Sequence, residues 1–206
     1  MELLENTKVD KVIEQSFDKS MTYNEYRDLV KHLAETKSTS GNEKTEARIN
    51  FTMLNDRRMK RWDKTIKASE TVHKNVSKIK DKITWLVITE SWCGDAAHVL
   101  PAINKLAELN GNINLRIVLR DEHEELMDNF LTNGSRSIPK LIAVDNSSEE
   151  IISTYGPRPS EVTQMVNNFK SEYGMLTPEF KESLQHWYNK DKGQNVMHDM
   201  VQLFTD

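Results

Sequence analysis

Residues 83–98 read ITWLVITESWCGDAAH, and this stretch decides the fold. The nearly unbroken apolar run over 83–89 is typical of a β-strand that is covered by helices on both faces, since such a strand loses its polar alternation. Trp92, Cys93, Gly94 and Asp95 follow, and a helical pattern begins at Ala97. The sequence therefore predicts a buried strand, a tight turn that carries Cys93, and a helix.

The segments after this stretch alternate in type. Apolar spacing, turn residues and strand formers predict a helix over 97–109, a strand over 113–119, a short helix over 122–131, two strands over 139–144 and 150–154 joined by a hairpin, and a helix from Pro159. The order β-α-β-α-β-β-α predicts an α/β domain, a mixed four-stranded sheet flanked by helices.

Both ends of the chain read as helical. Thr22 and Glu25 have the spacing of a capping box, residues 37–42 read as a polar linker, and 43–80 is helical and strongly charged with sparse apolar positions. Helices are also expected after Thr177, in a segment that carries Phe180, Leu184, Trp187 and Tyr188, and over 196–204. We expect a helical N-terminal extension packed on the core over 1–80, including a first core helix from about 65, a core over 81–174 and a C-terminal helical extension over 175–206.

The basic run at 57–61 reads as a solvated helix face, because acidic residues are nearby in the sequence. These are Glu43, Glu46, Asp56 and Asp63.

Composition excludes several classes of protein. The 206 residues carry a net charge of −4, which gives no overall attraction to nucleic acid or to anionic membranes. No stretch approaches the roughly 20 apolar residues of a membrane helix, and residues 1–18 lack the apolar run of a signal peptide. One cysteine excludes an intrachain disulfide, and with six histidines it leaves no dense zinc framework. We expect a cytoplasmic protein with no metal, nucleic-acid or membrane partner.

Cys93 is the candidate for chemistry. A thiol at the start of a helix faces unpaired N–H groups and the positive end of the helix dipole, which favour the reactive thiolate. A cysteine three residues later would complete a redox dithiol, but that residue is Ala96. The sequence predicts an accessible thiol of low pKa that can attack a disulfide and needs an external thiol for release. The alternative is a buried, inert cysteine.

Three separated motifs carry a resemblance to a known family. Residues 92–96 (WCGDA), Pro101 and the Ile138–Pro139 pair resemble the thioredoxin superfamily, and more narrowly a bacterial thioredoxin-like family with a WCGD motif and helical additions at both ends. Residues 155–159 (YGPRP) are similar to that family too. The resemblance implies a thioredoxin-like fold with Cys93 as the attacking cysteine.

The resemblance also implies roles for other residues. Pro101 would kink the active-site helix, Pro139 would be a cis-proline beside the sulfur, and Gly156 would let a partner backbone come close. Val87 stands where thioredoxins bury an acid that assists proton transfer. This departure and Ala96 both affect release of the mixed disulfide.

Several residues are expected to line the site. Asp95 is a helix-start residue or a tuner of Cys93, His98 is a satisfied histidine or a proton shuttle, and Trp92 packs or lines a groove. Gly94, Ala96 and Ile138 complete the lining. Substrate-binding candidates are Arg136 and Arg158, whose guanidinium groups could meet an anionic partner, and Gly156.

Two functions from different classes follow. The first is single-cysteine (monothiol) thiol–disulfide exchange through Cys93 with a protein or a small thiol or disulfide, with no resident cofactor and with glutathione, a partner protein or another copy supplying the resolving thiol. The second is a non-catalytic protein-binding module on the same fold. An iron–sulfur carrier, a metal site that uses His73 or His123, and a Cys–His hydrolase fit the residues less well.

Overall fold

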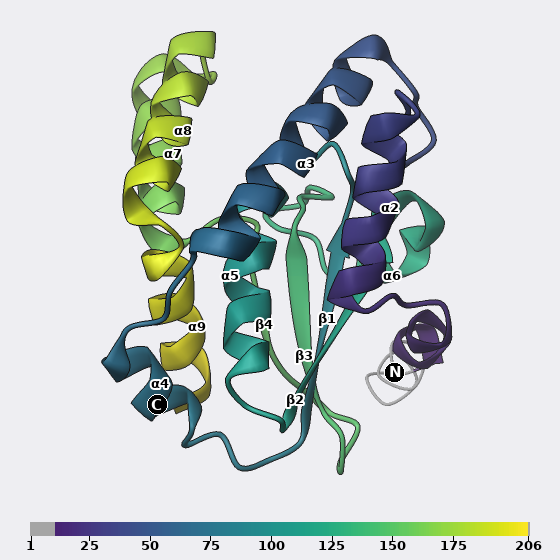
Figure 1. Ribbon diagram of the computed structural model, residues 1–206, viewed down its shortest axis with the longest axis vertical. Coiled ribbons are helices and arrows are strands. Elements are labelled where there is room, and N and C mark those ends of the chain that lie inside the picture. Colours follow the sequence, from purple (N-terminus) through teal and green to yellow (C-terminus); the bar gives the residue numbers. More distant parts are fainter. Residues whose placement is uncertain (1–10, 206) are drawn as a thin grey trace.

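The computed structural model describes residues 11–205 and contains one mixed sheet. Its strands are β1 (Ile83–Thr89), β2 (Ile113–Leu119), β3 (Lys140–Asp145) and β4 (Ile151–Tyr155), in the spatial order β2-β1-β3-β4. β2 runs parallel to β1, whereas β3 is antiparallel to β1 and β4 is antiparallel to β3. The predicted mixed four-stranded sheet with flanking helices is confirmed (Figure 1).

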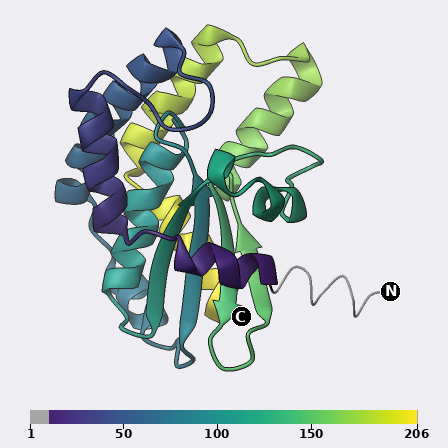
Figure 2. The same cartoon turned by 90° about the vertical axis from the view of Figure 1, so that its right-hand side faces the viewer.

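β1 is the central strand of the core. All seven of its residues are buried, and Leu86, Val87 and Ile88 have no exposed surface. An apolar run needs helices on both faces of the sheet to reach this burial. α5 (Ala96–Glu108) and α9 (Gln194–Thr205) cover one face, while helical residues 11–18 and α6 (Glu124–Asn129) cover the other (Figure 2).

The N-terminal half contributes α2 (Tyr23–Glu35), α3 (Glu46–Thr65) and α4 (Glu70–Val76). The capping box of Thr22 and Glu25 is confirmed, since each side chain accepts from the backbone N–H of the other residue. The prediction of a linker at 37–42 is wrong, because this segment packs against the core. Thr39 and Ser40 are buried and hydrogen-bonded to Thr52 and Ser91. A polar run resembles a linker in the sequence when its partners lie far along the chain.

The C-terminal half contributes α7 (Ser160–Tyr173) and α8 (Pro178–Asp191) before α9. α7 and α8 project beyond the sheet, and α9 returns along it (Figure 1). Asp199 of α9 accepts from the Ser160 N–H at 2.7 Å, which satisfies an orphan donor at the start of α7. This contact ties α7 to α9.

The remaining regular element is a 3-10 turn, η1 (Arg120–Glu122), just before α6. No helix within 11–205 combines the length and apolar character needed to cross a membrane. The expected absence of a signal peptide concerns residues 1–18, of which 1–10 lie outside the described residues. The expected boundaries at 80/81 and 174/175 stay predictions.

Candidate functional site

The turn between β1 and α5 places Cys93 at the start of a helix. The Cys93 N–H donates to the Glu90 carbonyl at 3.1 Å, and the Cys93 carbonyl accepts from the Ala97 N–H at 3.2 Å. α5 then begins at Ala96 and contains Pro101, as predicted. The short turn aims the sulfur at the helix N-terminus.

The sulfur also touches the loop before β3. The Ala96 N–H donates to Cys93 Sγ at 3.4 Å, and the thiol donates to the Ile138 carbonyl at 3.2 Å. The Ile138–Pro139 peptide bond is cis. The structure therefore brings together Cys93, Ala96, Ile138 and Pro139, as the resemblance implies.

The electrostatic expectation for Cys93 is wrong for this structure. The residue is only 7% exposed, and burial, followed by the charge of Asp95, raises the pKa of the thiol to about 12. The Ala96 N–H and Arg158 act in the opposite direction but are outweighed. Because desolvation penalises the thiolate more than one helix end stabilises it, the sulfur is protonated at neutral pH.

Asp95 joins three segments of the chain beside the sulfur. Its carboxylate lies 2.8 Å from Arg158 Nε, in the loop between β4 and α7, and accepts from the Tyr188 hydroxyl of α8 at 2.9 Å. It makes no capping bond to α5, and burial raises its pKa in spite of Arg158. The anion that Arg158 was expected to meet is therefore a residue of its own chain.

His98 is a packed, neutral residue in this structure. Its Nδ1 accepts from Trp62 Nε1 at 3.0 Å, Nε2 lies 2.9 Å from Gln185 Oε1, and its ring stacks on Tyr188. Burial lowers its pKa to about 4. Of the two roles expected for His98, these contacts fit the hydrogen-bonded, packed histidine and not the proton shuttle, because both ring nitrogens are bonded to other residues.

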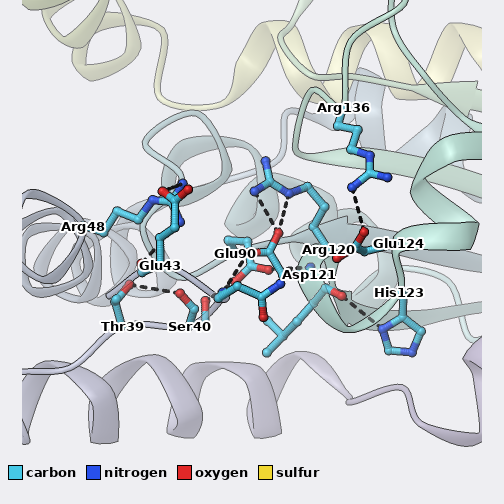
Figure 3. Close-up of polar contacts among 12 residues, drawn as sticks. Thr39, Ser40, Glu43, Arg48, Glu90, Arg120, Asp121, His123, Glu124 and Arg136 are labelled. Atoms are coloured by element: carbon cyan, nitrogen blue, oxygen red, sulfur yellow. Dashed lines mark hydrogen bonds and ion pairs between the residues drawn. The ribbon is translucent and has the colours of Figure 1, made fainter. Parts of the chain in front are cut away.

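Two expected substrate-binding residues have partners within the chain. Arg136 forms ion pairs with Asp128 at 2.6 Å and Glu124 at 3.0 Å on α6, and the Glu124 pair is drawn in Figure 3. Gly156 has φ +106°, and a Cβ there would lie 2.3 Å from the Pro139 carbonyl oxygen. The close approach that Gly156 permits is thus made by its own proline loop.

Trp92 is half-buried between two guanidinium groups. Its ring lies 4.5 Å from Arg48 and 5.0 Å from Arg120. Arg48 pairs with Glu43 and Arg120 with Asp121, each at 2.8 Å (Figure 3). The aromatic neighbour of Cys93 therefore both packs and keeps part of its ring at the surface.

A buried acid that the sequence reasoning missed lies behind the motif. Glu90 has no exposed surface; it accepts from the Ser40 hydroxyl and from the Asp121 N–H at 2.9 Å (Figure 3). Burial raises its pKa. The available signal was its position, an acid that directly follows an apolar strand.

α3 is fixed to the same turn by polar contacts. Asn55 Nδ2 donates to the Ser91 carbonyl at 2.9 Å, and Thr52 Oγ1 lies 2.8 Å from Ser91 Oγ. One turn further on, Arg58 donates to Asn55 Oδ1 at 3.1 Å, and its Nη1 lies 3.8 Å from where a Cβ on Gly94 would be. α3 thus borders the motif.

Comparison with known proteins agrees with this fold. A family model described as thioredoxin matches residues 41–170. The chain belongs to the thioredoxin family. This assignment covers the sheet, the Cys93 turn, the proline loop and α3.

Solved structures show the same fold at low identity. A protein of unknown function from Pseudomonas aeruginosa is 18% identical with a TM-score of 0.58, over 73% of this chain and 83% of that one. An HIV epitope-scaffold is 16% identical with a TM-score of 0.55, over 89% of this chain and 97% of that one. No curated protein matches the chain.

Within 11–205, no three His, Cys, Asp or Glu side chains gather in a way that could hold a metal ion. The Cys93 site contains one sulfur, the ion pair of Asp95 with Arg158, and hydrogen bonds between residues of the chain. The expectations about cofactor and resolving thiol stay predictions.

Proposed function

We propose that this thioredoxin-family protein binds other proteins at the face around Cys93 and Pro139 and does not turn over disulfides. The observation that carries the proposal is the state of the sulfur. The only cysteine is covered, and its thiol hydrogen is donated to the Ile138 carbonyl. With a pKa of about 12, a fraction on the order of 10⁻⁵ would be thiolate at pH 7.

The surroundings of the sulfur support binding over turnover. Ala96 supplies no second sulfur, and the acid beside Cys93 is already paired with Arg158 and Tyr188. Trp92 is a half-buried aromatic residue next to this closed site, and aromatic residues are favoured anchors at protein interfaces. A reducing compartment such as the cytoplasm suits this function, because it keeps Cys93 as a thiol.

Capture from a cell extract tests the proposal. Wild type and Cys93→Ala are immobilised in parallel, with and without dithiothreitol, and bound proteins are quantified by mass spectrometry. We expect the same partners at the same yield in all four samples. Partners that are lost in Cys93→Ala and released from wild type by dithiothreitol would contradict the proposal and support exchange.

Single-thiol exchange is the second candidate, because Cys93 Sγ lies between the Ala96 N–H and the loop of cis-Pro139. Exchange would require the thiol to leave the Ile138 carbonyl and lose its proton to solvent. The sulfur would attack R–S–S–R′, form Cys93–S–S–R and expel R′S⁻. A second thiolate, such as that of glutathione, would then attack the sulfur atom bound to R. This step forms a disulfide between glutathione and R and releases Cys93 as a thiolate.

Glutathionylation separates the two candidates. Wild type and Cys93→Ser are incubated with oxidised glutathione at pH 7.5, and the intact masses are followed over time. Exchange predicts rapid addition of one glutathione to wild type only. No addition to the folded wild type, with addition once urea unfolds it, would support the binding function.

A further inference from the structure

The basic run of α3 lacks the acidic neighbours that the sequence places beside it. Asp56 and Asp63 both pair with Arg27 of α2, at 3.2 Å and 2.9 Å. Glu43 pairs with Arg48. The run does lie on a largely solvated helix face, since Arg57, Lys60 and Arg61 are exposed. However, three of the four acids that were expected to offset it pair with other cations.

The cations of the run are left without carboxylate partners. Within 11–205, no carboxylate lies within ion-pair distance of Arg57, Arg58, Lys60 or Arg61. Arg57 is exposed, whereas Arg61 lies over the Trp62 ring at 4.2 Å and donates to Asn189 Oδ1 at 2.5 Å. Arg58 in turn donates to Asn55. Neutral neighbours thus hold the guanidinium groups of both Arg58 and Arg61 in place.

The unpaired charge borders the candidate site. Arg58 is half-buried beside Gly94. Burial, followed by the positive charge of Arg61, lowers its pKa, although the negative charge of Asp95 acts in the opposite direction. A half-buried cation that forms no ion pair is stabilised further when a second anion arrives. The position of Arg58 means that such an anion would sit next to the Cys93 turn.

Apolar side chains share this side of α3. Phe51 is 50% exposed, and Leu54 is half-buried. Phe51, Leu54, Arg58 and Arg61 follow helical spacing, so they lie along one face. In Figure 1, the upper part of α3 and the α7–α8 pair stand apart, which leaves the upper part of α3 without a helix packed on that side.

We propose that this face of α3, formed by Phe51, Leu54, Arg57, Arg58 and Arg61, docks an acidic segment of a partner protein that carries apolar residues between its carboxylates. The proposal rests on the proposed binding function and names its partner class. Charge complementarity selects an acidic segment, and the exposed Phe51 selects one with apolar residues. The net charge of −4 disfavours nucleic acid as the partner, and so does the presence of only three arginines in the proposed docking face.

Fluorescence anisotropy with a defined probe tests the proposal. The probe is a fluorescein-labelled 14-residue peptide of Glu and Leu at helical spacing, compared with the same peptide carrying Lys for Glu and with a labelled single-stranded DNA. The full-length chain is used as wild type, as R57Q/R58Q and as K74Q/K78Q. The last variant removes two exposed charges elsewhere, at α4 and just after it.

We expect the Glu peptide to bind more tightly than the Lys peptide and the DNA, and to weaken as NaCl rises. R57Q/R58Q should weaken it about fivefold, the sum of one exposed and one half-buried charge contact, whereas K74Q/K78Q should change it less than twofold. F51S should weaken the Glu peptide with no change in charge. Circular dichroism melting confirms that each variant folds.

Three results would overturn the proposal: equal effects of R57Q/R58Q and K74Q/K78Q, binding of the Lys peptide or DNA at least as tight as that of the Glu peptide, or no binding of the Glu peptide. Repeating the extract capture with R57Q/R58Q separates this failure from failure of the proposed function. If R57Q/R58Q captures the same partners as wild type, the proposal of an α3 docking face is rejected and the proposed binding function stands. Dependence of capture on Cys93 would remove the binding function instead.

Discussion

Two carboxylates flank Cys93, the buried Glu90 and the half-buried Asp95, and the chain accommodates them in different ways. Glu90, before the cysteine, is held by neutral donors, the Ser40 hydroxyl and the Asp121 N–H. Asp95, after it, is held by the charge of Arg158 and by the Tyr188 hydroxyl. Burial raises the pKa of both acids.

The difference decides which acid controls the sulfur. Asp95 raises the pKa of Cys93, while Glu90 faces the loop at Ser40 and Asp121. Asp95 also connects the motif to the segments before α7 and in α8, so its contacts close the site. Glu90 instead anchors the N-terminal loop to the end of β1.

The largest expected effect is on thiol reactivity. At pH 7.5, iodoacetamide should alkylate Cys93 about a thousandfold more slowly than a thiol with the ordinary pKa of 9.0, because burial and Asp95 raise its pKa to about 12. Rates are measured by intact mass between pH 6 and 10.5 and should still be rising at the upper limit. Asp95→Asn should speed alkylation, whereas Glu90→Gln should not. Equal effects of the two substitutions would contradict the distinction between Asp95 and Glu90. A wild-type alkylation rate that stops rising below pH 9 would contradict the raised pKa of Cys93.

The next effect is on stability. Arg158→Met leaves Asp95 without its cation and should lower the free energy of unfolding by about 2 kcal/mol, below the range for fully buried pairs because the Arg158 side chain is 27% exposed. Urea unfolding at pH 7 measures this loss, and the double variant D95N/R158M should recover most of it. Arg136→Met, whose ion pairs are exposed, should change the midpoint much less; a loss as large as that of Arg158→Met would show that burial is not the cause.

A smaller effect is expected at the second partner of Asp95. Tyr188→Phe removes one hydrogen bond but keeps the ring stacked on His98, so the free energy of unfolding should fall by about 1 kcal/mol. Thermal and urea unfolding would measure it. The matched change Tyr173→Phe, at an exposed position, should have no measurable effect. An unchanged stability of Tyr188→Phe would mean that the carboxylate depends on Arg158 alone.

The smallest expected effect is on how steeply the free energy of unfolding changes with pH. Because burial raises the pKa of Glu90 in the folded state, the folded chain binds more protons than the unfolded chain above the ordinary value of 4.5. The contribution of Glu90 to the free energy of unfolding therefore falls as pH rises through the folded pKa. Glu90→Gln should remove this loss and make stability less dependent on pH above 4.5, measured by urea unfolding. The exposed control Glu150→Gln should keep the wild-type slope, and an equal slope in Glu90→Gln would contradict the role of burial.

Most of the sheet could be predicted because its signals are local. The apolar run at 83–89, the strand at 113–119 and the hairpin at 145–148 each follow from side chains that are neighbours in sequence. The capping box at Thr22 is local as well. Helix ends moved by only a few residues, since end positions depend on weak local preferences.

The site could be predicted only in part. The contact between Cys93 and the loop at Ile138–Pro139 agrees with the family resemblance. The pairing of Asp95 with Arg158 and Tyr188 could not be predicted, because the two partners come from segments whose separation in sequence says nothing of their distance. The same reason hid Ser40 within an apparent linker.

Residue identity and local spacing were enough to predict the order of strands and helices, the single sulfur at a helix start and the lack of a second one. Tertiary packing is what covers the sulfur and keeps it protonated, and what leaves the cations of residues 57–61 without carboxylate partners. Both outcomes depend on desolvation and on distances between charges, and these quantities exist only once distant segments have packed together.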